Sequence, residues 1–171
     1  MSEKTNCRIG VISDTHGLLR PEAISALQGS DLIIHAGDIG TKAILDRLHT
    51  IAPVLAVRGN NDTGPWAENI PATRIETIGG VTVQILHDAK ELVAPCARCR
   101  VVISGHSHRP CIIERHGLLF MNPGSAGPRR FSLPVSVARL DVHGDTFSAR
   151  LIELDVPRSQ ARGMGGGACA G

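Results

Sequence analysis

Aromatic residues are nearly missing from this chain of 171 residues, which has no Tyr, one Trp and three Phe. The core must therefore be built from Val, Ile, Leu and Ala, and a long track of stacked nucleic-acid bases is disfavoured. A strong charge imbalance is missing too, because the formal net charge is only +2. The sequence thus gives no strong nucleic-acid signal and no electrostatic argument for a membrane as partner.

The chain also has no long hydrophobic run and no cysteine framework. No apolar run approaches the roughly 18 residues of a membrane span, and the N-terminus MSEKTNCRIG lacks the apolar stretch of a signal peptide. The five cysteines are an odd number without framework spacing, which suits a reducing compartment. We therefore expect a cytoplasmic protein. For Cys96 and Cys99, which form a CxxC, we expect ordinary thiols, with a redox pair or half of a zinc site as alternatives.

The first half of the chain alternates between apolar strands and amphipathic helices. The pattern predicts strands at 7–13, 31–35 and 54–57 and helices at 21–28 and 41–49. Pro21 falls in the first turn of one helix, and Thr41 is the candidate N-cap of the other. Near-continuous apolar strands are those covered on both faces, so this half predicts parallel βαβ units.

The second half changes to an antiparallel pattern, which begins with a hairpin signal at Gly79-Gly80. The pattern predicts strands at 74–78, 81–86, 101–104, 112–114, 118–121, 135–141 and 146–154. The predicted fold class is therefore α/β, a sandwich of mixed sheets in a single domain over residues 1–157. Residues 158–171 are rich in Gly and have little to bury, so we expect a disordered tail there.

Residue types that bind metals follow these apolar strands directly, where an open α/β sheet collects its ligands. They are two carboxylates, four imidazoles and one amide: Asp14, His16, Asp38, Asn60, His87, His106 and His108. Such oxygen and nitrogen donors suit Mn, Fe, Zn, Ni or Co. Seven donors are too many for one ion and match two ions roughly 3.5–4 Å apart. One carboxylate would then bridge the ions, and a hydroxide between them would be the nucleophile.

Each residue has a simpler interpretation when it is taken alone. Asp14 could cap a helix or a turn, Gly37-Asp38 could be a turn, and Asn60 could lie in an ordinary loop. His87 could be a surface histidine, and a His-x-His pair binds metal in only a minority of cases. Their joint occurrence at successive strand ends favours the dinuclear site.

The same residues fall in five ordered motifs. These are Asp14-Thr-His16 within SDTHG, Gly37-Asp38, GNND at 59–62, His87, and Gly105-His106-Ser-His108 within GHSHRP. With NPGS at 122–125, this series resembles the calcineurin-like metallophosphoesterase superfamily, and most of all its small YfcE-type phosphodiesterase branch. The resemblance spans about residues 7–155. It implies a four-layer α/β/β/α sandwich that hydrolyses a small phosphoester, foremost a phosphodiester, with a metal-bridging hydroxide.

The resemblance also implies how the ligands divide between the two ions. Asp14, His16 and His108 would hold one metal, Asn60, His87 and His106 would hold the second, and Asp38 would bridge them. Asp38, Asn60 and His106 are the candidate catalytic residues. The expected cofactors are two divalent metal ions, foremost Mn²⁺, with Fe, Ni, Zn or Co as alternatives.

Two positions depart from the family pattern. Asn61 stands where many members have the histidine that protonates the leaving oxygen, and an amide cannot be a general acid. We therefore expect a preference for esters with good leaving groups, or protonation by another group or by water. After His87 this branch often continues with Gly and His, whereas the present chain reads Asp88-Ala89-Lys90, which leaves the rim of the pocket undefined.

Further polar residues follow these motifs, and each has two interpretations. Arg129 and Arg130 are the candidate substrate-binding residues, because they could clamp a phosphate, or they are solvated surface charges. Asp62 could orient a group behind the site or simply solvate its loop. Asn122 could pack beneath the site or make a turn.

The alternative function is a catalytically weak or inactive protein-interaction scaffold of the same fold. The scaffold subunit of the retromer, in the same branch, is the precedent. The complete set of seven ligands disfavours this alternative, whereas the missing acid histidine keeps it open. We leave open whether the protein is a homo-oligomer.

Overall fold

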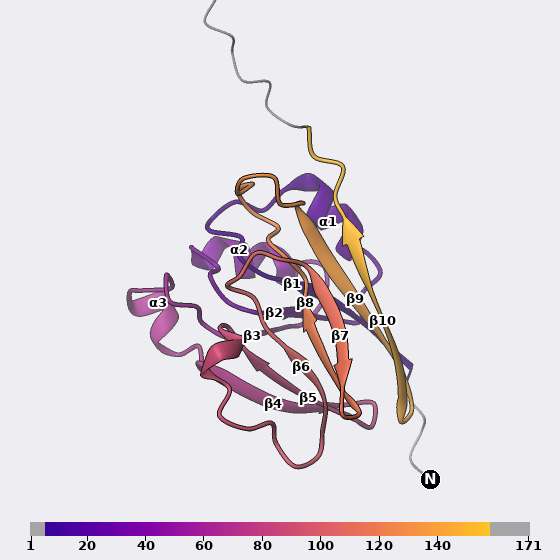
Figure 1. The fold of residues 1–171 in the computed structure, drawn as a ribbon. Coiled ribbons are helices and arrows are strands. Elements are labelled where there is room, and N and C mark those ends of the chain that lie inside the picture. Colours follow the sequence, from indigo (N-terminus) through magenta and orange to yellow (C-terminus); the bar gives the residue numbers. More distant parts are fainter. Residues whose placement is uncertain (1–5, 158–171) are drawn as a thin grey trace, which may run out of the picture.

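The computed structural model describes residues 6–157, so residues 1–5 and the predicted tail at 158–171 lie outside the described part of the chain. Ten strands and three short α-helices follow one another along the chain, with one 3₁₀ helix after the fifth strand (Figure 1). They are β1 (Asn6–Ile12), α1 (Pro21–Leu27), β2 (Leu32–His35), α2 (Lys42–His49), β3 (Val54–Ala56), α3 (Pro65–Glu68), β4 (Thr73–Ile78), β5 (Val81–Leu86), η1 (Ala89–Glu91), β6 (Cys99–Ile103), β7 (Cys111–Arg115), β8 (Leu118–Asn122), β9 (Ser136–His143) and β10 (Thr146–Glu153).

The first sheet has the strand order β10-β9-β1-β2-β3. β1, β2 and β3 are parallel, as the βαβ pattern predicts, whereas β9 and β10 add to the sheet in the antiparallel direction. Pro21 occupies the first turn of α1, and Thr41 is at the N-cap of α2, where its side chain makes no capping hydrogen bond. Both helices begin and end within one or two residues of their predicted bounds.

The second sheet has the order β4-β5-β6-β8-β7. The hairpin at Gly79-Gly80 pairs β4 with β5, and β7 pairs with β8 in the antiparallel direction. β6 pairs in parallel with both β5 and β8. Of the strands predicted as successive and antiparallel from residue 112 onward, β7 pairs with β8 and β9 with β10, whereas β8 and β9 lie in different sheets. The chain then crosses to the first sheet for β9 and β10.

Two apolar cores hold the layers together. One lies between the two sheets and includes Ile9 and Ile34 of the first sheet with Ile85, Ile103 and Met121 of the second. The other packs α1 and α2 against the opposite face of the first sheet, through residues such as Leu27 and Leu48. The sandwich of mixed sheets is therefore confirmed. After β4, the only helical segment within residues 6–157 is the short η1.

A disulfide joins Cys96 to Cys99, so the prediction of ordinary thiols is wrong for this pair. Their Cα atoms are 5.2 Å apart, within the range that a disulfide spans. The Gln84 side chain of β5 accepts a hydrogen bond of 2.9 Å from the Cys96 amide, which ties this loop to the second sheet. Cys7 and Cys111 are free cysteines in the described part of the chain. No helix within residues 6–157 is long and apolar enough to cross a membrane.

Candidate metal centre

The predicted ligands converge because the parallel strands of both sheets end near one another. Asp14 and His16 follow β1, Asp38 follows β2, and Asn60 follows β3. His87 directly follows β5, and the loop after β6 contributes His106 and His108. Hydrogen bonds join these loops directly: the Asp14 amide donates to Gly37 O at 3.0 Å, and the Gly105 amide donates to His87 O at 2.9 Å. The strand-end pattern of the sequence therefore corresponds to one place in the fold.

Five of the seven predicted ligands have a left-handed backbone conformation. Their φ values run from 46° to 66°, in the order His16, Asp38, Asp14, His108 and His106. Residues other than glycine adopt this region uncommonly, and each such residue carries a conformational cost. Such strain, gathered at one edge of the fold, persists only where the surroundings fix it and is typical of functional sites.

The first group consists of Asp14, His16 and His108, whose ligand atoms lie within 4.8 Å of one another. His108 Nε2 is 3.2 Å from Asp14 Oδ1, and His16 Nε2 is 3.8 Å from the same oxygen. Asp14 is fully buried and its other oxygen, Oδ2, accepts hydrogen bonds from Ser13 Oγ and the His106 amide. Oδ1 therefore remains directed at the two imidazoles.

The second group consists of Asp14, Asp38 and His87. Asp38 Oδ2 lies 3.3 Å from His87 Nε2 and 3.7 Å from His16 Nε2, so this carboxylate faces histidines that the resemblance assigns to different metals. The His87 ring is fixed from behind, since its Nδ1 is 2.8 Å from Ala36 O. As an N–H donor to that carbonyl, Nδ1 leaves the lone pair of Nε2 for a cation.

Buried ligand atoms without hydrogen-bond partners test whether this site fits metal ions. Asp14 Oδ1, His16 Nε2, His87 Nε2 and His108 Nδ1 have no such partner among the described residues. Buried polar atoms are normally paired, because leaving one unpaired costs about 1–3 kcal/mol. Three of these four atoms take part in the short contacts just described. All four are carboxylate oxygen or imidazole nitrogen atoms, which are ligands that divalent ions bind. The residues therefore fit the predicted metals.

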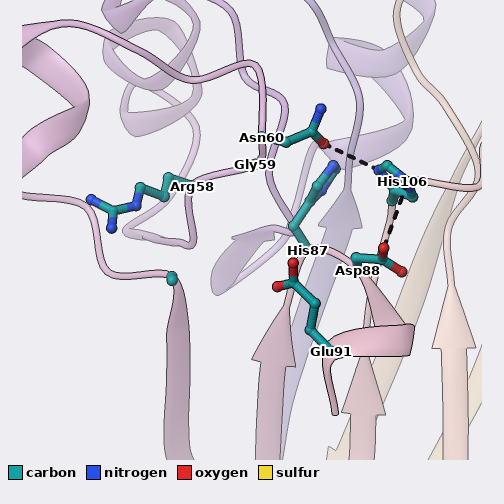
Figure 2. A pocket seen from close by; sticks show the side chains of 8 residues that line it. Arg58, Gly59, Asn60, His87, Asp88, Glu91 and His106 are labelled. Atoms are coloured by element: carbon teal, nitrogen blue, oxygen red, sulfur yellow. Dashed lines mark hydrogen bonds and ion pairs between the residues drawn. The ribbon is translucent and has the colours of Figure 1, made fainter.

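Asn60 and His106 lie at the outer side of this site, on the wall of a cavity of about 360 Å³ (Figure 2). His106 Nδ1 is 3.1 Å from Asn60 Oδ1, and its Nε2 is 3.7 Å from Asp88 Oδ2. The His106 side chain is 41% exposed, compared with 6% for His87. The structure thus brings all seven predicted ligands to one region, where two of them remain open to solvent.

Several residues hold the loops that carry the ligands. Asp62 is buried and accepts hydrogen bonds from the amides of Gly40 and Gly59. It therefore orients the loops after β2 and β3 and does not merely solvate its own loop. Asn122 donates to Gly105 O at 2.7 Å and accepts from the Gly124 amide, so it both supports the GHSH loop and makes a turn.

Gly59 shows how closely the loops approach. A Cβ atom at this position would collide with Asp38 Oδ1 and the Asp38 amide. A glycine in this motif is therefore required by the close approach of two loops.

Asn61 contacts Asp38 twice. Its amide donates to Asp38 Oδ1 at 2.9 Å, and its side-chain Nδ2 donates to Asp38 Oδ2 at 2.7 Å. Burial alone would raise the pKa of Asp38, but the nearby His87 ring and the hydrogen bonds from Asn61 outweigh it and hold the pKa well below its ordinary value. The residue at the family's acid position therefore secures the ionised form of the central carboxylate.

His35 is a fully buried histidine beneath the site whose role the sequence did not reveal. The Gly37 amide donates to its Nδ1, so the ring's proton is on Nε2, which lies 2.9 Å from Thr15 Oγ1. Thr15 in turn donates to Ile39 O. Burial lowers the pKa of His35 to about 4, and the neutral ring cross-links the loops after β1 and β2.

The pKa values of His16 and His87 move in opposite directions. For His16, burial lowers the pKa, and the charges of Asp38 and Asp14 only partly oppose it. For His87, burial is outweighed by its short contact with Asp38, its hydrogen bond to Ala36 O and the nearby carboxylate charges, so its pKa is raised.

The two predicted substrate-binding arginines differ in their surroundings. Arg129 donates to the carbonyl oxygens of Val156 and Leu133, so its guanidinium is engaged in fixing its own loop. Arg130 is exposed, and its charge is close enough to His16 to help lower the pKa of that histidine. The structure thus does not favour the pair as a clamp, and Arg130 is the one of the two whose charge acts on the candidate site.

Solved structures of other proteins share this fold. Vacuolar protein sorting 29 from Cryptosporidium parvum has a similar fold, with a TM-score of 0.71 and 17% identity over 87% of this chain and 98% of that one. A novel archaeal phosphodiesterase superposes with a TM-score of 0.69 and 23% identity, over 85% of this chain and 99% of that one.

A probable metallophosphoesterase from Methanothermobacter thermautotrophicus is 37% identical over 163 residues, which cover 87% of this chain and 94% of that protein. Residues 7–145 match the family described as the calcineurin-like phosphoesterase superfamily domain. The chain belongs to this superfamily, as its motifs predict.

Proposed function

We propose that this protein is a phosphoesterase that uses two divalent metal ions, foremost Mn²⁺, and that it acts on small phosphodiesters. The observation that carries the proposal is the set of buried, unpaired ligand atoms, Asp14 Oδ1, His16 Nε2 and His87 Nε2, at the converging strand ends. When bound, the two ions would supply Lewis acidity at the phosphoryl group and a nucleophile near neutral pH.

The chain's own residues would provide the geometry of this reaction. Asp38, ionised at neutral pH and held by Asn61, faces both His16 and His87 and is suited to the position between the ions. Asp14 and His108 would complete the first metal site. Asn60 and His106, which line the open cavity, would complete the second where the substrate arrives.

The cavity bears on the class of substrate. About 360 Å³ is at the small end of ligand pockets, which favours a small phosphoester over a long polymer. Arg130, near His16, is the residue we assign to a phosphate oxygen of the substrate. Asn61 leaves the leaving group without a general acid at that position, so good leaving groups should be preferred.

The test combines metal quantification with hydrolysis. The purified protein should bind two Mn²⁺ ions and hydrolyse activated phosphodiesters such as bis-p-nitrophenyl phosphate, with activated monoesters measured alongside. Asp38→Asn is the control, because it removes the central charge while it keeps the size of the side chain. Loss of hydrolysis in this variant supports the proposal. Intact binding of two ions without hydrolysis of any ester contradicts it and favours the interaction scaffold.

A further inference from the structure

We propose that Asp88 is a positioning residue that orients His106 for the second metal ion, an inference that rests on the proposed function. Asp88 follows the ligand His87 directly and begins η1. Its Oδ2 is 3.7 Å from His106 Nε2, on the same cavity wall (Figure 2). The sequence motifs assign no role to this carboxylate.

The two nitrogens of the His106 ring face different partners. Nδ1 lies 3.1 Å from Asn60 Oδ1, so these two atoms are adjacent, as two ligands of one ion would be. Nε2 points the other way, toward Asp88. If Nδ1 binds the ion as a neutral imidazole nitrogen, the ring's proton must be on Nε2, where only an acceptor can hold it. Asp88 is an acceptor at that position.

The contrast with His87 shows why His106 needs such a partner. The ring of His87 is held by Ala36 O at 2.8 Å, so a backbone carbonyl fixes its orientation. His106 is 41% exposed, and its side-chain hydrogen-bond, ion-pair and ring contacts in the described structure are those with Asn60, Asp88 and the His87 ring. Metal-binding histidines generally donate their second N–H to a carboxylate, a carbonyl or water, and loss of that partner typically weakens metal affinity by about 10–100-fold.

Asp88 is itself held in place. Its Oδ1 accepts a hydrogen bond of 3.0 Å from the Lys90 amide and caps η1, so its Oδ2 remains for His106. The short segment that departs from the family pattern after His87 therefore supplies both the cap and the acceptor. A single side chain couples this loop to the second half of the metal centre.

The experiment titrates Mn²⁺ into metal-free protein by calorimetry and records the electron paramagnetic resonance spectrum at two equivalents. Asp88→Asn keeps an oxygen that can cap η1 but removes the charged acceptor. Asp88→Ser, which also keeps a capping oxygen, serves as a second variant. Glu91→Gln is the matched control, because Glu91 lines the same cavity and has no hydrogen bond or ion pair with His106 in the described structure.

We expect Asp88→Asn and Asp88→Ser to weaken the second Mn²⁺ by about 10–100-fold, to leave the first unchanged and to lose the signal of coupled ions. Glu91→Gln should bind both ions as the wild type does. If Glu91→Gln weakened binding of the second Mn²⁺ equally, or if the Asp88 variants bound two ions normally, the proposed role of Asp88 would be overturned. The proposed function would not be affected by either result. A wild-type protein that binds fewer than two ions would overturn the proposed function as well.

Discussion

Asn61 offers the sharpest test of how this site works without the acid that the resemblance implies at that position. Its side chain donates to Asp38 Oδ2 at 2.7 Å, while its backbone amide, which any residue retains, donates to Oδ1 at 2.9 Å. Two substitutions separate its contributions. Asn61→Ala removes only the side-chain hydrogen bond, whereas Asn61→His removes the same bond and adds the acid that many family members have.

The expected magnitudes follow from these contacts. A hydrogen bond to a charged group contributes about 1.5–3 kcal/mol, and because Asn61 is exposed we take the lower end. Asn61→Ala should therefore lower kcat/KM by about 10-fold for every substrate, since Asp38 is less well fixed. A general acid contributes roughly 10²–10⁴-fold where the leaving group needs a proton. For a substrate with a poor leaving group, the kcat/KM of Asn61→His should then exceed that of Asn61→Ala by about 100-fold or more.

The assay compares two phosphodiesters that differ only in their leaving group, p-nitrophenol or phenol. The ratio of kcat/KM between Asn61→His and Asn61→Ala is measured for each, so the shared loss of the Asp38 hydrogen bond cancels. We expect a ratio near one for p-nitrophenol and a large ratio for phenol. Equal ratios for the two esters would refute the idea that position 61 limits protonation of the leaving group.

Two further predictions concern the loops beneath the site. Gly59→Ala should destabilise the metal-free protein by about 1–3 kcal/mol and weaken Mn²⁺ binding, because its Cβ would collide with Asp38. Unfolding in guanidinium chloride and calorimetry check this, and unchanged values in both would contradict the close approach. His35 has a pKa of about 4 when folded and an ordinary value of 6.5, so its contribution to stability is complete above pH 6.5 and is lost as pH falls toward 4. At about 1.4 kcal/mol per pH unit, the loss is about 3 kcal/mol. His35→Gln, which keeps a donor for Thr15 Oγ1, should flatten the pH dependence of the free energy of unfolding, and parallel curves for variant and wild type would show that His35 does not titrate in this way.

The fold was largely predictable because its strands are apolar and its turns carry clear signals. The parallel β1–β3 unit followed from near-continuous apolar runs, and the β4–β5 hairpin followed from Gly79-Gly80. The parallel pairing of β6 with β8 and the return of β9 to the first sheet did not follow, because both depend on contacts between distant strands. Local periodicity carries no information about such partners. The Cys96–Cys99 disulfide was missed for a different reason, since the CxxC spacing permits thiols, metal binding and a disulfide alike.

The candidate metal site was predictable at the level of residue types, because strand ends of parallel sheets meet at one edge of the fold. Asp14, Asp38 and His87 each end an apolar run, and the structure brings them within reach of one ion. The roles of Asn61 and Asp88 were not predictable, because they depend on which atom faces which. The motif shows only that an acid is missing at position 61, whereas the structure shows that the backbone and the side chain of Asn61 each donate to one oxygen of Asp38.

Asn61 and Asp88 both hold the side chain of a predicted ligand, a role that sequence motifs do not show. A ligand atom has a defined direction only when the rest of its side chain is held, and for His87 and Asp14 a backbone carbonyl and a buried hydroxyl group do this. Ala36 O holds His87, and Ser13 Oγ holds Asp14. The backbone offers the His106 ring no such partner in the described structure, and its Nε2 faces Asp88 instead. Asp38 accepts hydrogen bonds from both the backbone and the side chain of Asn61. Asn61 and Asp88 stand where the sequence departs from the pattern that the resemblance implies, and we therefore expect substitutions at these two positions to change metal affinity and leaving-group preference while the seven predicted ligands stay the same.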